Sequence, residues 1–133
     1  MPMSQGFESI PDELTALSER VIGAAIEVHR RLGPGFQEVT YRRALSIELE
    51  AIGLAFEVEV PVSLVYRGKT IGEGRVDMLV EKQLVLELKA AEANPKKYNR
   101  QVTVYLKATG LRLGLVINFE LDRLVDGIAR VAN

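Results

Sequence analysis

The hydrophobic positions in the first third of the chain repeat at helical spacing. Within Asp12–Leu32 they recur every three or four residues, the period of an α-helix with one buried face. These positions are Leu14, Leu17, Val21, Ala25, Val28 and Leu32. The glycines on either side of Pro34 interrupt the pattern, because glycine and proline favour turns. A second helix is predicted from about Gln37 to Ile52, with Gly53 as its C-terminal cap.

After residue 54 the pattern becomes typical of extended strands. Ala55–Leu64 is rich in valine and phenylalanine and is predicted to be a strand that breaks at Pro61. Tyr66–Thr70 is predicted to form a hairpin turn. The later predicted elements are strands at Arg75–Val80 and Leu84–Lys89, a helix from Pro95 to about Ala108 closed by Gly110, a buried strand at Arg112–Asn118, and a weaker extended segment at Leu124–Val131. Helices before and between strands predict an α/β sandwich, with a central mixed β-sheet flanked by α-helices.

The length and composition fit one globular domain. The chain has 133 residues, of which 47% are hydrophobic and 26% charged, and a domain of this size can bury a core without cross-links. We expect a flexible N-terminal tail at residues 1–11 and a single domain at residues 12–133. The lack of cysteine excludes disulfides, thiolate metal sites and a cysteine nucleophile. Without a signal segment or an apolar run of ~20 residues, the sequence predicts a cytoplasmic protein that does not enter a membrane.

The charge pattern gives only local support for nucleic-acid binding. The formal net charge is −1, whereas domains that grip phosphates usually have a basic footprint. Basic residues nevertheless gather on the first two predicted helices and between residues 94 and 112, where no acid occurs. The candidates for holding a phosphate backbone are Arg42, Arg43, Lys96, Lys97 and Arg100. Taken alone, these segments are more simply explained as solvated faces.

Three charged residues in the central predicted hairpin form a candidate active site. If residues 81–83 make the turn, the register places Asp77 opposite Glu87. Directly opposed residues have Cβ atoms ~5 Å apart. Lys89 lies two residues beyond Glu87 and so projects from the same face of the strand. A register shift of one residue would move Asp77 to the other face.

These three residues suit a divalent cation. Like charges that face each other in a sheet destabilise it, so such a pair suggests a cation between the carboxylates. Two carboxylates and water suit Mg²⁺, a hard ion that prefers oxygen ligands. A lysine beside a metal-bound phosphate can orient water and stabilise developing charge. The alternative is a solvated strand in which Lys89 only neutralises Glu87, and for an isolated motif of this kind that alternative is favoured.

Other candidates lie on the predicted helices. Gln101 and Tyr105 are four residues apart and share a helical face, although surface and core roles explain them equally well. Glu38 stands early in the second helix, where the helix dipole alone favours an acidic residue. The functional alternative is that Glu38 is a third carboxylate at the metal. His29, the only histidine, lies on an apolar helical face, so a core role is favoured over a role as an extra metal ligand.

Together these residues resemble a known nuclease pattern. The residues that carry the resemblance to the PD-(D/E)xK superfamily, in its RecB-like branch, are Asp77, Glu87-Leu88-Lys89 and Gln101-x-x-x-Tyr105. Gly35–Tyr41 is similar to the signature after which the GxxExxY protein family is named. Within it, Tyr41 is expected to pack in the core and to form a hydrogen bond through its hydroxyl group. Matching segments cover about residues 14–131, with Val104 as a departure where a small polar residue is expected.

The resemblance implies a restriction-endonuclease-like core and a metal-dependent nuclease. It implies Mg²⁺ or Mn²⁺ bound by Glu38, Asp77, Glu87 and the backbone carbonyl of Leu88. Lys89 would position the attacking water, and Gln101 and Tyr105 would face the site and its substrate. Nucleic acid is the implied partner, with DNA favoured over RNA by analogy alone.

Two alternatives to a self-sufficient enzyme stay open. The first is a non-catalytic scaffold that binds nucleic acid or protein, which the near-neutral charge favours and the complete set of Asp77, Glu87 and Lys89 opposes. The second is a subunit that acts only within an oligomer, such as a homodimer that encloses duplex DNA.

Overall fold

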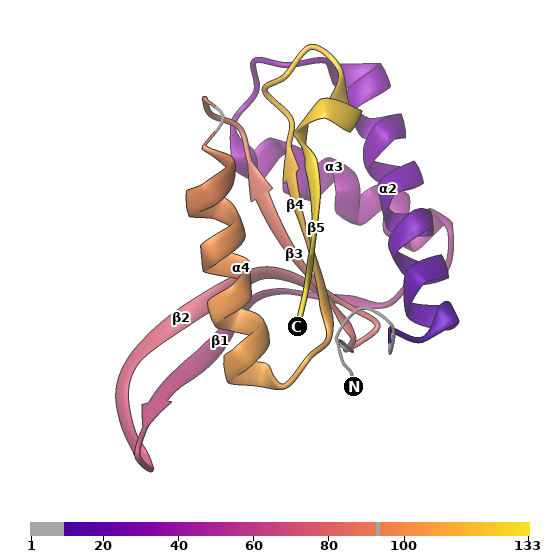
Figure 1. The fold of residues 1–133 in the computed structure, drawn as a ribbon. Helices are drawn as coiled ribbons and strands as arrows, with labels where there is room; N and C mark the ends of the chain where they lie inside the picture. The colour runs from indigo at the N-terminus through magenta and orange to yellow at the C-terminus, as the bar shows by residue number, and fades with distance from the viewer. Residues whose placement is uncertain (1–9, 93) are drawn as a thin grey trace, which may run out of the picture.

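The computed structural model describes residues 10–92 and 94–133 (Figure 1). The elements are α2 (Asp12–Leu32), α3 (Glu38–Ala51), β1 (Phe56–Tyr66), β2 (Lys69–Val80), β3 (Leu84–Lys89), α4 (Pro95–Thr109), β4 (Leu113–Asn118), the 3₁₀ helix η1 (Leu124–Gly127) and β5 (Ile128–Ala132). Most of the predicted tail, residues 1–9, lies outside the described residues, and Ile10 packs against the core. The three predicted helices end within one or two residues of their expected bounds.

The strands form one mixed sheet between two helical layers. The strand order is β1-β2-β3-β4-β5, with β3 and β4 parallel and the other neighbours antiparallel. Helices α2 and α3 cover one face of the sheet and α4 covers the other (Figure 1). This arrangement confirms the predicted α/β fold with a central mixed sheet flanked by helices.

The apolar side chains divide between the two faces of the sheet. Leu86 and Leu88 belong to the larger core under α2 and α3, as the predicted register requires. Val85 and Val116 belong to the second core under α4. Gly114 lets α4 approach closely, because a Cβ there would lie 2.5 Å from a methyl carbon of Val102. Strand β3 therefore presents alternate residues to two different layers.

Two sequence predictions about strands are wrong in detail. The first strand does not break at Pro61, which pairs with Arg75 and lies within β1. Since β1 is an edge strand of the described sheet, a proline without an N–H group is tolerated there. The predicted extended segment from Leu124 begins instead with the 3₁₀ turn η1, and only β5 is extended.

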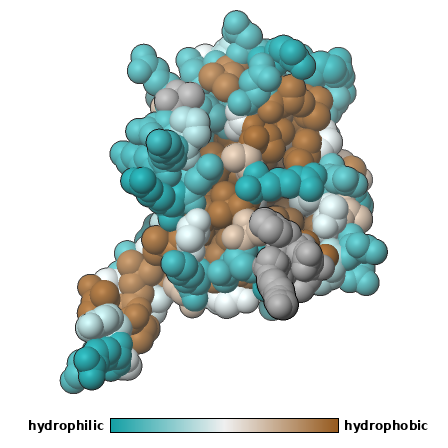
Figure 2. Space-filling view, viewed as in Figure 1, coloured by the Kyte–Doolittle hydropathy of each residue, from teal (hydrophilic) through white to brown (hydrophobic). Residues whose placement is uncertain are grey.

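The β1–β2 hairpin projects beyond the rest of the molecule (Figure 1). Its two-residue turn confirms the predicted hairpin, with Arg67 at φ 49° and Gly68 at φ 81°, the positive angles that tight hairpin turns favour. Apolar side chains lie on this projecting hairpin in Figure 2, and Val65, Tyr66 and Ile71 are exposed. None of the described helices is long and apolar enough to cross a membrane.

Candidate active site

Asp77 is held against β3 by a side-chain hydrogen bond. The β2–β3 ladder pairs Val80 with Leu84 and Met78 with Leu86, which is the predicted register, and ends there. At the next position, Oδ2 of Asp77 accepts a hydrogen bond of 2.8 Å from the backbone N–H of Leu88. A buried backbone N–H needs an acceptor, and Asp77 supplies one where the ladder stops. The carboxylate is thereby fixed beside β3 rather than paired through the backbone.

Glu87 is a buried carboxylate on the face of the sheet that α4 covers. Only 3% of the residue is exposed. Its Oε2 lies 3.1 Å from Nζ of Lys89, two residues along the same strand. Its Oε1 is buried and has no hydrogen-bond partner in the part of the chain that the structure describes. Because an unsatisfied buried oxygen is costly, Glu87 has a lone pair available for a ligand.

The electrostatics of the site reflect two carboxylates close together and away from water. Burial, aided by the charge of Asp77, raises the pKa of Glu87 to about 7. Burial also raises the pKa of Asp77, against the hydrogen bond from Leu88. Burial alone would lower the pKa of Lys89, but the neighbouring Glu87, with Glu38 and Asp77, raises it above its ordinary value. Ionisation of both carboxyl groups would therefore place more negative charge in the site than Lys89 neutralises.

Glu38 reaches this region from the start of α3. It lines a cavity of about 160 Å³ with Asp77, Leu88 and Arg42, while Arg42 also lies 3.5 Å from a carboxylate oxygen of Glu59. The start of α3 is anchored by the fully buried Tyr41. The partners of its hydroxyl are the carbonyl of Gly33, to which it donates, and the N–H of Phe36, from which it accepts. This is the packing role predicted for Tyr41.

Gln101 and Tyr105 share a face of α4 but point toward β2. The amide of Gln101 donates to the hydroxyl of Tyr105 over 3.3 Å, and the same hydroxyl accepts from the backbone N–H of Arg75 at 3.4 Å. The Tyr105 ring also fills the space beside Gly74. Among the described contacts, neither side chain is hydrogen-bonded to Asp77 or Glu87. These contacts join α4 to β2, and the catalytic role predicted for both residues stays a prediction.

The contacts of His29 lie in the core. Its ring is buried on α2, and Nε2 is 2.9 Å from the backbone carbonyl of Leu121, in the loop that follows β4. The ring centroid lies 6.4 Å from that of Phe119. These are the contacts of a core residue, as its place on the apolar helical face favours, and the role of an extra ligand stays a prediction.

The predicted basic residues flank the sheet on opposite sides. Arg43 is exposed on α3, whereas the other exposed residues lie on the first turns of α4, on the other face. These are Lys96, Lys97 and Arg100. Arg42 is half-buried and faces the cavity with Glu38.

The sequence prediction missed Tyr98. Nζ of Lys89 lies 5.0 Å from the centroid of the Tyr98 ring, so this aromatic face helps to hold the ammonium group. Tyr98 precedes Gln101 by three residues and Tyr105 by seven, which places all three on one helical face. That spacing is the signal from which Tyr98 could have been found.

A divalent cation fits the donor atoms of this site. Across residues 10–92 and 94–133, no three or more His, Cys, Asp or Glu side chains are grouped as a ready metal site. Mg²⁺, however, needs only one or two protein carboxylates and keeps several waters. The unpartnered Oε1 of Glu87, the nearby Asp77 and the excess negative charge match that requirement.

Comparison with known proteins identifies the family. A model of the PD-(D/E)XK nuclease superfamily matches residues 15–131, which is most of the chain. The protein belongs to the PD-(D/E)XK nuclease superfamily. In the sequence of this superfamily member, Asp77 and Glu87-Leu88-Lys89 resemble the acidic and lysine residues of the name, with Val76 where the name has proline, and their roles stay predictions.

The other comparisons are weaker. The chain is similar to a solved structure titled "Crystal structure of SSO0001", with 17% sequence identity and a TM-score of 0.49. The match covers 88% of this chain and 78% of that one. No curated protein matches the chain significantly.

Proposed function

We propose that this superfamily member is a metal-dependent nuclease that hydrolyses phosphodiester bonds, with DNA as its substrate. The observation that supports this most directly is the buried Glu87, whose Oε1 lacks a partner among the described residues while Oε2 contacts Lys89. A structural carboxylate at this position would be expected to have both oxygens satisfied. The finer assignments, to the RecB-like branch and the GxxExxY family, rest on Gln101-x-x-x-Tyr105 and Gly35–Tyr41 and stay predictions.

The cation of this proposal is Mg²⁺ or Mn²⁺. Its ligands would be Asp77, Glu87 and the backbone carbonyl of Leu88, with Glu38 as a further ligand or as a residue that orients one. When bound, the ion would neutralise charge on the phosphate and lower the pKa of water. The oxygen-only donor set suits these hard ions better than zinc, which prefers nitrogen and sulfur.

Lys89 acts in this proposal through its positive charge. The raised pKa keeps its ammonium group protonated at neutral pH, so it is not suited to abstracting a proton. A protonated lysine can donate hydrogen bonds to the attacking water and to a phosphate oxygen, and so hold both in line. The contact with Glu87 and the Tyr98 ring limits the positions that Nζ can adopt.

The nucleic-acid backbone would be held by the exposed basic residues. Lys96, Lys97 and Arg100 extend from α4 and Arg43 from α3, while Arg42 lies nearer the carboxylates. Contacts of this kind are independent of sequence and weaken with salt. The homodimer stays a prediction. If two copies of the chain enclosed a DNA duplex, the basic residues on α3 and those on α4 could both contact it.

A cleavage assay tests the proposed function. The purified protein would be incubated with linear, supercoiled and single-stranded DNA and with RNA, in Mg²⁺, Mn²⁺ or EDTA. We expect metal-dependent cleavage of DNA that Glu87→Gln reduces by about a thousandfold, since loss of a ligand removes several kcal/mol of charge stabilisation. Glu50→Gln, a change at an exposed acid on α3, is the matched control and should cleave like the natural protein.

The same assay separates the enzyme from a scaffold. Binding of DNA without cleavage in either metal, and equal behaviour of the natural protein and Glu87→Gln, would contradict the nuclease proposal and favour a non-catalytic binding module. Cleavage that persists in the Glu87→Gln variant would indicate a contaminating nuclease or a different active site.

A further inference from the structure

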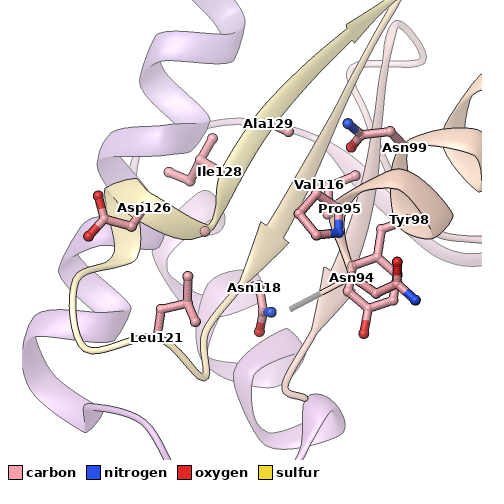
Figure 3. A pocket seen from close by; sticks show the side chains of 11 residues that line it. Asn94, Pro95, Tyr98, Asn99, Val116, Asn118, Leu121, Asp126, Ile128 and Ala129 are labelled. Atoms are coloured by element: carbon pink, nitrogen blue, oxygen red, sulfur yellow. The ribbon is translucent and has the colours of Figure 1, made fainter. Parts of the chain in front are cut away.

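A second cavity lies beside the candidate active site, between the first half of α4 and the strands β4 and β5 (Figure 3). Its volume is about 150 Å³. The lining residues that matter here are Tyr98, Asn99, Val116, Asn118, Ile128 and Ala129. The proposed catalytic set includes none of them.

The sheet register places this cavity next to Glu87 and Lys89. In the parallel β3–β4 ladder, Glu87 is paired with Val116 and Lys89 with Asn118. Paired residues on adjacent strands project from the same face, and the strands are ~4.8 Å apart. The ring of Tyr98, which lines the cavity, also contacts Nζ of Lys89. A molecule bound in the cavity would therefore adjoin the residues proposed to hold the scissile phosphate.

Asn99 is the polar group in the cavity that needs a partner. Its Oδ1 is buried and makes no hydrogen bond within the described residues. Figure 3 shows its amide extending from α4 toward the strands. The amide of Asn118, by contrast, donates to the carbonyl of Ala91 and accepts from the N–H of Glu120. Asn118 is thus fixed by the protein, whereas Asn99 is left to bind something else.

The chemistry of the lining points to a nucleobase rather than a phosphate. Of the described residues around the cavity, none is basic. An asparagine amide can donate and accept at once, which is how it reads the edge of a base. Tyr98 supplies an aromatic ring, and Val116 and Ile128 supply apolar surface for the faces of a flat ring. The volume is below the ~300 Å³ of pockets for whole ligands, so it suits one ring system.

We propose that this cavity binds one unpaired nucleobase of the strand that is cut, next to the scissile phosphate. The inference rests on the proposed nuclease function and makes it more specific. A base within a duplex is stacked and paired and cannot enter a side cavity without being extruded. The preferred substrate is therefore single-stranded, or frayed at the position of the cut.

Binding can be tested without catalysis. The ¹⁵N-labelled full-length protein, in EDTA, would be titrated with each of the four deoxynucleosides and with deoxyribose as the probe that lacks a base. We expect saturable shifts of the Asn99 side-chain amide with at least one deoxynucleoside and none with deoxyribose. Asn99→Leu, in which the backbone amides of Val116 and Ile128 report binding instead, should abolish it, whereas Gln83→Leu, a change at an exposed turn residue, should not.

Asn99→Leu also separates a binding role from a structural one. Replacing an unsatisfied buried amide with an apolar group of similar shape is neutral or stabilising, so the thermal midpoint should not fall. In cleavage of a single-stranded oligonucleotide, one abasic residue moved along the strand should slow cutting about tenfold at a single position next to the cut. The Asn99→Leu variant should lose that positional dependence.

The outcomes distinguish this inference from the proposed function. If no deoxynucleoside shifts the Asn99 amide and Asn99→Leu cleaves with the same positional dependence, the inference is overturned and a buried water is the partner of Oδ1. If the natural protein cleaves nothing, the proposed function fails, and the titration alone decides whether the cavity binds a base.

Discussion

Strands β3 and β4 lie side by side in the same environment but carry different side chains. Both have six residues, they run parallel in register, and nearly all of their residues are buried. On the face under α4, β4 presents Val116 where β3 presents Glu87. At the ends of the strands, neutral Asn118 stands beside charged Lys89. The fold can therefore be built with uncharged residues in this layer.

The difference shows what the charge in β3 costs. Burial opposes ionisation of Glu87 and raises its pKa to about 7, a penalty that Val116 does not incur. A buried ion pair is weak evidence of stability, because desolvation can exceed the attraction between its members. Metal binding explains the charged residues of β3 better than stability does. Strand β4 shows what the same layer contains when no metal site is needed.

The largest expected effect comes from making β4 resemble β3. Val116→Asp would bury a carboxylate of similar size without a lysine two residues away, since Asn118 holds that place. We expect a loss of about 3–5 kcal/mol in the free energy of unfolding, measured by urea denaturation. Val116→Ala is the control for lost packing alone and should cost less. A loss below ~1 kcal/mol in Val116→Asp would mean that water reaches this layer freely.

A second prediction concerns the pH dependence of the metal-free protein. Well below pH 4.5, Glu87 is protonated in both the folded and unfolded states, so its ionisation does not change the stability. Between its ordinary pKa of 4.5 and the folded value of about 7, only the folded state keeps the proton. Stability should therefore fall by about 3 kcal/mol as the pH rises from 5 to 8, at ~1.4 kcal/mol per pKa unit.

The control for this prediction is Glu87→Gln in EDTA. Its stability should change less between pH 5 and pH 8, and at pH 8 it should exceed that of the natural protein. Denaturation at several pH values measures both quantities. A natural protein that becomes more stable as the pH rises over this range would show that Glu87 is not held in a desolvated site.

The smallest expected effect tests the packing of β4 against α4. An added Cβ at Gly114 would lie 2.5 Å from a methyl carbon of Val102 and 3.3 Å from the carbonyl oxygen of Val85. We expect Gly114→Ala to cost about 1–3 kcal/mol, because backbone cannot move aside easily. Gly23→Ala on α2, where a Cβ meets nothing within 4 Å, should instead stabilise by up to ~1 kcal/mol. Equal effects at both positions would contradict the close contact.

The sequence was sufficient to predict most of the fold and part of the site. Period and turn residues predicted the helices α2, α3 and α4, the Arg67–Gly68 turn and the β2–β3 register, because those features depend on neighbours in the chain. The continuity of β1 through Pro61 could not be predicted, because it depends on β1 being an edge strand.

The relations between distant side chains were harder to predict. The bond from Leu88 to Asp77 arises because the ladder ends at that point, and no local pattern records where a ladder ends. The unpartnered Asn99 depends on which strands lie opposite α4. The helical period predicts which face of α4 carries Tyr98. Its contact with Lys89 could not be predicted, because it depends on where α4 packs on the sheet.

The central claim is that Glu87 and Asp77 form a divalent metal site. It is tested most directly by the thermal midpoints of the natural protein and Glu87→Gln at pH 8, each in EDTA and in Mn²⁺. Binding at a hundred times the Kd contributes ~2.7 kcal/mol to the folded state. We predict that Glu87→Gln is the more stable protein in EDTA and that Mn²⁺ stabilises the natural protein enough to remove or reverse that order. Equal responses of the two proteins to Mn²⁺ would contradict the claim.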